Sequence, residues 1–204
     1  MTTLFLIRHG QTQWNLEGKY TGQSDIPLNS NGRLQALRAA MEFRNNPPDA
    51  IYSSDLIRAY ETAEIVANGC GFLARIEQDQ RLREINQGVW EGMHFDDIKA
   101  KFSAEFEARE ANPLEVAAPE GETVGQVQDR VLSAISDICA SNPPGSRIAI
   151  VAHGLALAII RAWYMEVPVQ DVWSLIPPNA KVLEVQVSPD LDSFRLKAGS
   201  TNTL

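Results

Sequence analysis

The sequence predicts an α/β protein: a three-layer α/β/α sandwich with a mostly parallel central sheet and a small helical lid insertion. Residues 4–7 and 147–152 are continuous apolar segments, which are typical of strands buried on both faces of a parallel sheet. Segments with the apolar spacing of helices alternate with these strands, as in sheets that helices cover on both faces. Between about residues 92 and 121 this alternation gives way to an acidic amphipathic stretch, which we interpret as the lid.

We expect a single domain over residues 1–204, with the lid inserted at about 92–121. A chain of 204 residues is long enough to bury one substantial hydrophobic core. It contains no internal repeat and no low-complexity linker that would mark a domain boundary.

The first half of the chain predicts strands at residues 4–7 and 50–52. Between them, apolar residues recur at helical spacing and predict a helix that ends at residues 45–48: Leu34, Leu37 and Met41. A second helix is expected directly after residues 53–54, two serines that suit an N-cap. Residues 72–76 predict a third strand.

The second half begins with the lid, whose apolar residues share one helical face: Phe95, Ile98, Phe102 and Phe106. Residues 123–126 match a capping box and begin a long helix. The strand at 147–152 is followed by a helix at about 155–164. Closing strands are expected at 182–187 and 194–196, and their edge leaves open a homodimer formed by strand pairing.

Composition argues against several classes of protein. No apolar run approaches the ~20 residues that a membrane helix needs, so we expect no membrane partner. The start of the chain has no positive charge and no signal-type cleavage site, and there are only two cysteines, Cys70 and Cys139. These features favour a reducing, cytoplasmic location.

The net charge of the chain argues against large anionic partners but not against small ones. The formal net charge is -8, which disfavours nucleic acid because a phosphate backbone repels such a surface at long range. A small phosphorylated metabolite needs only a local group of cations. The composition therefore leaves this class of partner open.

Two buried strands end in the same pattern, a histidine followed by a glycine. His9 follows the first strand and His153 follows the strand at 147–152. Because ligands of open parallel sheets lie beyond the carboxyl ends of the strands, we expect the two histidines to meet at one site. The following glycines let the backbone approach a ligand closely. Arg8 precedes the first histidine and adds a cation.

Arg58 is a further candidate because of its place in the chain. It falls in the expected first helical turn after residues 53–54, where backbone N–H groups favour anions. A cation is unfavourable there unless something negative is bound. Glu84 lies in a segment rich in turn formers, and a glutamate in that context is usually structural when taken alone.

Residues 8–15, Arg-His-Gly-Gln-Thr-Gln-Trp-Asn, resemble the signature of the histidine phosphatase superfamily, which includes phosphoglycerate mutases and many phosphatases. Five further segments resemble that family's substrate loop, second arginine segment, acid motif, pre-helix turn and second histidine: residues 21–28, 52–59, 82–85, 119–123 and 151–154. The six segments occur in the family's order across nearly the whole chain. Such an ordered set is highly specific.

The resemblance implies that His9 attacks phosphorus and carries the phosphoryl group as phosphohistidine. Its attacking nitrogen must be neutral, so we expect a backbone carbonyl to hold the proton of the other nitrogen. Arg8, Arg58 and His153 would surround the transferring oxygens. Fixed cationic donors of this kind can replace a metal, so the resemblance implies neither metal nor cofactor.

The remaining site residues also come from the resemblance. Glu84 would protonate the leaving oxygen and then accept a proton from water. Asn15 and the Gly154 backbone would add hydrogen bonds to the phosphoryl group. Thr21 and Gly22 would contact the part of the substrate that is not transferred.

The shared phosphohistidine does not separate a phosphatase from a cofactor-dependent phosphoglycerate mutase. Residues 86–92 resemble the phosphatase branch, and residues 92–121 offer few cations for a second phosphate. We therefore favour a phosphatase and keep the mutase as the alternative. A non-catalytic phosphate-binding regulatory module is the alternative of another class. The substrate stays open among phosphosugars, phosphoserine, phosphoglycerates and ribazole phosphate.

Overall fold

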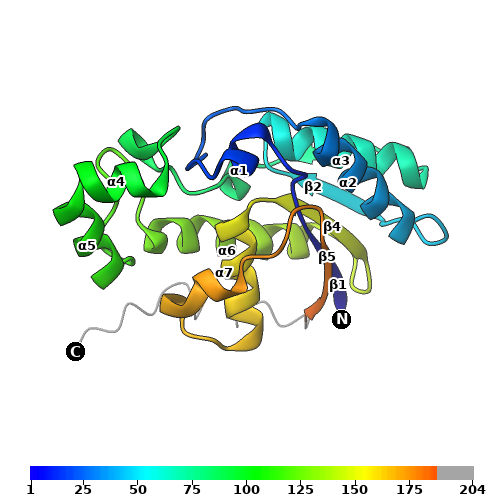
Figure 1. Cartoon of the computed structure of the whole chain (residues 1–204). Coiled ribbons are helices and arrows are strands. Elements are labelled where there is room, and N and C mark those ends of the chain that lie inside the picture. The colour runs from blue at the N-terminus through cyan, green and yellow to red at the C-terminus, as the bar shows by residue number, and fades with distance from the viewer. Residues whose placement is uncertain (188–204) are drawn as a thin grey trace.

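The computed structural model describes residues 1–187, which form a five-stranded sheet between layers of helices (Figure 1). The strands are β1 (Thr2–Arg8), β2 (Ala50–Ser53), β3 (Glu77–Gln78), β4 (Arg147–Ala152) and β5 (Val182–Val187). Their order is β3-β2-β4-β1-β5, and all pairs are parallel except β1 with β5. The predicted α/β fold with a mostly parallel sheet is confirmed.

The two central strands, β1 and β4, are buried on both faces. Alternate residues of β1 enter two different cores: Leu4 and Leu6 belong to one, and Phe5 and Ile7 to the other. A strand with two buried faces has no polar side to alternate with, which is why the sequence runs apolar without interruption. The parallel register brings Arg8 opposite Ala152, so both strands end at the same edge of the sheet.

Helices cover both faces of this sheet. On one face lie α6 (Val124–Ser141) and α7 (Gly154–Met165), and on the other α2 (Ser30–Glu42) and α3 (Ile57–Cys70). The predicted capping box is present at α6, where the Thr123 hydroxyl accepts from the backbone N–H of Gln126. A short helix, α1 (Gln13–Glu17), follows the first strand.

The helix predicted after the first strand is present as α2, but the residues whose spacing indicated it do not face the core. Leu34, Leu37 and Met41 are 50–57% exposed, and the helix instead buries small residues such as Ala36 and Ala40. The reason is the close approach of α2 to α3. A Cβ placed on Gly69 of α3 would lie only 2.7 Å from the Cβ of Ala40, so large side chains do not fit between these helices.

Two other local predictions need correction. Residues 72–76 do not form a strand, because on the side of β2 that faces away from β4 the pairing begins only at Glu77. The serines at 53–54 do not cap α3 as predicted, because the helix begins later, at Ile57. Its exposed backbone N–H donates to the Asp25 carboxylate at 2.7 Å. A cap from a distant loop leaves no local pattern in the sequence.

The lid consists of α4 (Phe95–Lys101) and α5 (Ser103–Ala111), which lie to one side of the sheet in Figure 1. The predicted aromatic face is interrupted at Phe102, between the two helices. A small separate core holds the lid together, with Trp90 and Phe106 at its centre and Tyr20 packed against them. Its aromatic rings contact one another at centroid distances of 6.0–6.4 Å.

β5 confirms the first predicted closing strand and forms one edge of the described sheet. The second, at 194–196, lies outside the described residues. Pairing of this edge in a homodimer stays a prediction. Within residues 1–187 no helix has the length and apolar character needed to span a membrane.

Candidate active site

His9 and His153 meet at the carboxyl edge of the sheet. The adjacent parallel strands β1 and β4 end directly before them, and the two ring centroids are 5.1 Å apart. Both side chains are buried, with 3% and 0% of the residue exposed. The sequence-based expectation that these two histidines converge is therefore met by the geometry.

A cavity of about 330 Å³ opens at this edge. Eight of the nine residues named from the sequence line it: Arg8, His9, Asn15, Thr21, Gly22, Arg58, Glu84 and Gly154. His153 is the exception, because its ring is fully buried behind that of His9. The cavity is the candidate active site.

The imidazole of His9 is held in one tautomer. Its Nδ1 donates to the backbone carbonyl of Gly10 at 2.7 Å, and a carbonyl can only accept. The neutral ring therefore leaves Nε2 unprotonated, as a nucleophile requires. Burial lowers the pKa of His9 well below 6.5, and the neighbouring charges of Arg58 and Arg8 lower it further. The ring is neutral at physiological pH.

His153 is stabilised in its neutral form by similar causes. Burial is the largest influence lowering its pKa well below 6.5, and the positive charge of Arg58 adds to it. Its Nε2 shares a hydrogen bond of 2.8 Å with the hydroxyl of Ser54. Ser54 follows β2, so three neighbouring strands contribute to this corner of the site.

Arg58 is a buried cation and Arg8 a partly buried one, and neither has a carboxylate as hydrogen-bond partner within the described residues. Arg58 is fully buried and donates to the carbonyls of Gly22 and Ser24 at 2.7 and 2.8 Å. Arg8 donates to the carbonyl of Pro177 at 2.8 Å. Neither guanidinium forms a salt bridge with any residue in the described part of the chain.

The protein environment acts against these positive charges. Burial lowers the pKa of Arg58 to about 10 and also lowers that of Arg8, while the charge of Glu84 works in the opposite direction for both. Both groups still carry their charge at neutral pH. Within residues 1–187 the Nε atoms of both are buried without a hydrogen-bond partner. Two such cations beside one cavity form a site for an anion.

Glu84 lines the same cavity and is held by backbone donors. Its Oε1 accepts from its neighbour Ile85 at 3.0 Å, and its Oε2 accepts from the N–H of Leu155 at 3.2 Å. Gly154 gives this carboxylate its room. A Cβ at that position would lie 3.4 Å from Glu84 Oε2 and 3.2 Å from the side chain of Ile176.

The other three predicted residues belong to the segment that follows β1. Asn15 closes a capping box with Thr12, using its Oδ1 and leaving its Nδ2 for a ligand. The hydroxyl of Thr21 is buried and has no partner among residues 1–187. Gly22 has φ 51°, and a Cβ there would lie 2.0 Å from the Glu91 carboxylate. Only glycine fits this turn.

Sequence reasoning missed Arg130, which holds the segment that carries Glu84. From α6 its guanidinium donates to the carbonyls of Arg81, Arg83 and Glu84 at 2.6–2.9 Å. It also donates to both carboxylate oxygens of Glu122. Its only signal in the sequence was an arginine within an otherwise apolar helical stripe.

Asn179 was also missed. Its side-chain Nδ2 donates to the backbone carbonyl of His9 at 2.9 Å, and the next residue, Ala180, donates to the carbonyl of Arg8 at 2.8 Å. These two hydrogen bonds hold the end of β1 on the side that faces away from β4. An asparagine beside prolines in a loop gave no indication of this contact.

This arrangement of fold and site is shared with a known family. The chain belongs to the histidine phosphatase superfamily (branch 1), which its residues 4–198 match. It is 36% identical over 191 residues to "Probable phosphoglycerate mutase GpmB" of Shigella boydii, an alignment that covers 94% of this chain and 87% of that protein.

Two solved structures share the fold over nearly their whole length. Bacillus stearothermophilus YhfR is 36% identical, with a TM-score of 0.82 and 92% of each chain covered. A mycobacterial glucosyl-3-phosphoglycerate phosphatase, solved with VO3, is 31% identical, with a TM-score of 0.82 and 94% of each chain covered. The protein is therefore an enzyme of the phosphatase and mutase-like class.

The buried histidines predict that acid destabilises the protein already below pH 6.5. In the unfolded chain both histidines gain protons near that pH, whereas in the fold their pKa values lie well below it. Stability is therefore fully present above 6.5 and falls as pH decreases. The slope reaches about 1.4 kcal/mol per pH unit for each histidine.

Urea unfolding between about pH 7.5 and about pH 5.5, above most carboxylate titrations, measures this slope. Replacing both buried histidines by glutamine should flatten it, whereas His94→Gln, at an exposed position, should leave it unchanged. An identical slope in the double variant would contradict the prediction.

Proposed function

We propose that this protein is a phosphomonoesterase that hydrolyses a small phosphorylated metabolite through a phosphohistidine on His9, with Glu84 as general acid and base. One observation carries the proposal. Two guanidinium groups without carboxylate partners, that of the buried Arg58 and that of the partly buried Arg8, line the same cavity as His9, whose Nε2 is unprotonated. This is the arrangement that a phosphate dianion needs for binding and for nucleophilic attack.

In the first step His9 Nε2 attacks phosphorus while the bond from phosphorus to the ester oxygen breaks. Negative charge on the three equatorial oxygens is stabilised by Arg8 and Arg58, whose positions do not have to reorganise. As His9 becomes cationic, the Gly10 carbonyl stabilises the N–H at Nδ1. Glu84 gives its proton to the departing oxygen, which leaves as an alcohol.

In the second step water attacks the phosphohistidine. Glu84, now a carboxylate, takes a proton from this water as the oxygen bonds to phosphorus. The bond from nitrogen to phosphorus breaks, its electron pair returns to Nε2, and phosphate is released. Glu84 recovers the proton that the first step consumed, so the cycle closes without another reactant.

The other predicted residues support the anion or the leaving group. Asn15 Nδ2 and the N–H of Gly154 are donors at the cavity wall, placed to bind phosphoryl oxygens. His153 is proposed to lie near the transferring oxygens together with Arg8 and Arg58, because its ring centroid is 5.1 Å from that of His9. Thr21 and Gly22 line the side of the cavity that faces the lid and would contact the part of the substrate that is not transferred.

The cations around the cavity favour a phosphatase over a mutase. Besides Arg8 and Arg58, the cavity is lined within residues 1–187 by one more cation, Lys19, and that side chain is paired with Glu17 at 2.7 Å. Arg109 lines the adjoining cavity, where the carboxylate of Glu110 offsets its charge. Lys99 and Lys101 of the lid are exposed. A mutase that holds a bisphosphate needs further cations for the second phosphate. The similarity to a named phosphatase agrees with this preference, whereas the similarity to GpmB keeps the mutase as the alternative.

Hydrolysis of p-nitrophenyl phosphate in EDTA tests the nucleophile. We expect turnover by the native chain and a loss of at least about 10³-fold in His9→Ala, because no other imidazole reaches the cavity. His94→Ala is the matched control, since this histidine is exposed at the lid, and should retain full activity. Absence of turnover across a broad set of phosphate esters would favour the phosphate-binding module.

Glu84→Gln tests the acid. An alkyl phosphate has a poor leaving group that needs a proton, whereas p-nitrophenolate leaves without one. We expect kcat for an alkyl phosphate to fall about 10²-fold or more, and formation of the phosphohistidine from the aryl ester to change far less. Rapid-quench measurement of that first step compares the two substrates. Equal losses would remove Glu84 from the role of acid.

A direct comparison separates phosphatase from mutase. With 3-phosphoglycerate as substrate, we expect phosphate release to exceed isomerisation both with and without added 2,3-bisphosphoglycerate. The two products are distinguished by NMR and by a phosphate assay. Isomerisation that is faster than phosphate release would establish the mutase alternative instead.

A further inference from the structure

A second cavity, of about 430 Å³, adjoins the candidate active site beneath the lid. We call it the outer chamber, and its lining residues are Tyr20, Phe106, Arg109, Glu110, Ala111, Pro113, Gln170 and Trp173. Tyr20 and Trp173 also line the active-site cavity, so the two spaces share a wall. Its volume lies within the roughly 300–1,000 Å³ that is usual for small-molecule sites.

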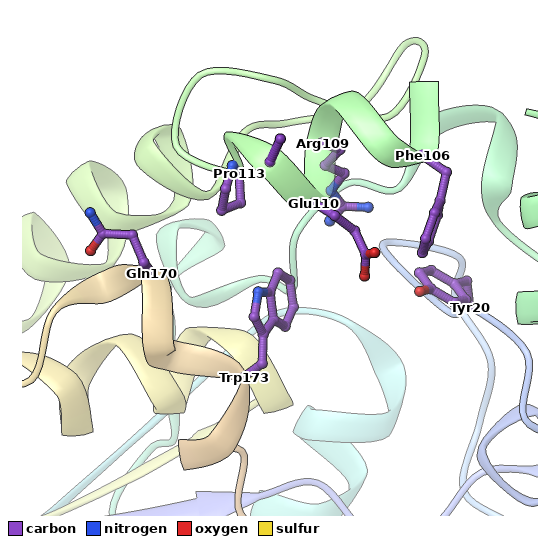
Figure 2. Close-up of a pocket in the computed structure, with 8 residues that line it drawn as sticks. Tyr20, Phe106, Arg109, Glu110, Pro113, Gln170 and Trp173 are labelled. Atoms are coloured by element: carbon purple, nitrogen blue, oxygen red, sulfur yellow. The ribbon is translucent and has the colours of Figure 1, made fainter. Parts of the chain in front are cut away.

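The chamber lies between two segments that are far apart in the chain. Figure 2 shows α5 of the lid on one side, with Arg109 and Glu110, and the turn η3 (Val169–Leu175) on the other, with Gln170 and Trp173. The side chains of Tyr20, Glu110 and Trp173 point into the space between these segments. Because the two cavities share Tyr20 and Trp173, the chamber offers space for the other end of a substrate whose phosphate is bound at His9.

Arg109 is the buried charged side chain of the chamber. It is 6% exposed, and its guanidinium lies 5.2 Å from the ring centroid of Trp90 and 5.9 Å from that of Trp173. Its Nη1 donates to the side chain of Gln87 at 2.7 Å, and it forms no salt bridge within residues 1–187. The guanidinium therefore keeps donors for a ligand acceptor.

Glu110 determines which ligand these donors suit. Its carboxylate points into the same space as Arg109, so the two charges of the wall sum to zero. A carboxylate at this position repels a second phosphate or carboxylate group of a substrate. It accepts hydrogen bonds well, and Gln170 and the hydroxyl of Tyr20 both donate and accept. The polar lining therefore matches a ligand that also donates and accepts, as hydroxyl groups do.

The aromatic lining adds a flat apolar surface. Trp173 is 43% exposed, which is unusual for so large an apolar side chain, and Tyr20 and Phe106 stand opposite it in Figure 2. A ring can cover the indole with its apolar face while its edge meets the polar groups. A wholly apolar ligand would fill the space but would desolvate Arg109 and Glu110 without compensation.

We infer that the outer chamber binds the leaving-group end of the substrate and that this end is a neutral, polyhydroxylated ring, which makes the substrate class a sugar phosphate. The inference rests on the proposed function, because it assigns the alcohol that Glu84 protonates. The sugar hydroxyls donate to Glu110 and accept from Arg109, and one face of the ring packs on Trp173. The ester oxygen leaves with the sugar when its bond to phosphorus breaks.

Four probes of different leaving-group chemistry test the inference on the native chain: glucose 6-phosphate, trehalose 6-phosphate, 3-phenylpropyl phosphate and 3-phosphoglycerate. We expect kcat/KM for at least one sugar phosphate to exceed those of the apolar and anionic probes by about tenfold or more. A preference for 3-phenylpropyl phosphate or for 3-phosphoglycerate would overturn the inference, because the occupant would then be apolar or anionic.

A variant of the chamber makes the test sharper. Glu110→Leu keeps a similar volume and removes the acceptor, so kcat/KM should fall about tenfold for the preferred sugar phosphate and rise for 3-phenylpropyl phosphate. A merely structural effect would move both values in the same direction. Glu107→Gln is the matched control, because this residue lies on the same helix, is exposed and does not line the chamber. Parallel changes for the two substrates in Glu110→Leu would overturn the inference.

A binding measurement separates this inference from the proposed function. Calorimetry measures the affinity of His9→Ala, and of the double variant His9→Ala and Glu110→Leu, for glucose 6-phosphate and for trehalose 6-phosphate. This measurement needs no turnover. Binding that weakens about tenfold in the double variant supports the chamber even if no ester is hydrolysed. Equal affinity in the two variants, or no binding, overturns the chamber assignment even if p-nitrophenyl phosphate is hydrolysed.

Discussion

The burial of two uncompensated guanidinium groups is the constraint on which the site depends. Arg58 is fully buried and Arg8 is partly buried, yet within the described residues both donate hydrogen bonds only to backbone carbonyls. Removing a cation from water without an opposite charge is costly, and the lowered pKa values of both groups express that cost. In the function proposed above, a bound phosphoryl group would supply the missing negative charge, and the free protein would hold the charge arrangement of the bound state in advance.

The rest of the structure keeps this arrangement rigid. The parallel register of β1 and β4 places two histidines at one edge, and Asn179 fastens the end of β1 from the other side. Arg130 holds the segment before and including Glu84 through three backbone carbonyls, so a partly buried arginine positions this carboxylate. Because these contacts exist before any ligand binds, little reorganisation is left for the reaction itself.

The local sequence pattern was sufficient to predict a strand or helix wherever the residues that determine it are neighbours in the chain. The central strands were predictable because burial on both faces requires an uninterrupted apolar run, and α6 because Thr123 and Gln126 complete a capping box within four residues. The spacing of apolar residues also predicted the helix α2 but not its buried face, because a close helix pair selects small residues and leaves the larger Leu37 and Met41 exposed to solvent. The prediction failed at the start of α3 because the cap there comes from Asp25, in a distant loop.

By itself, the sequence determined that two histidines follow the ends of buried strands and that Arg8 precedes one of them, whereas the roles expected of Arg58 and Glu84 came from the family resemblance. The positions of the histidines are predictable because strand ends are defined by neighbouring residues, and parallel strands bring their ends to one edge. Only the tertiary structure decided that Arg130 supports Glu84, that His153 lies behind His9 and that Arg109 and Trp173 face one chamber. These contacts join residues far apart in the chain, and hydrophobic periodicity contains no information about which distant side chains will meet.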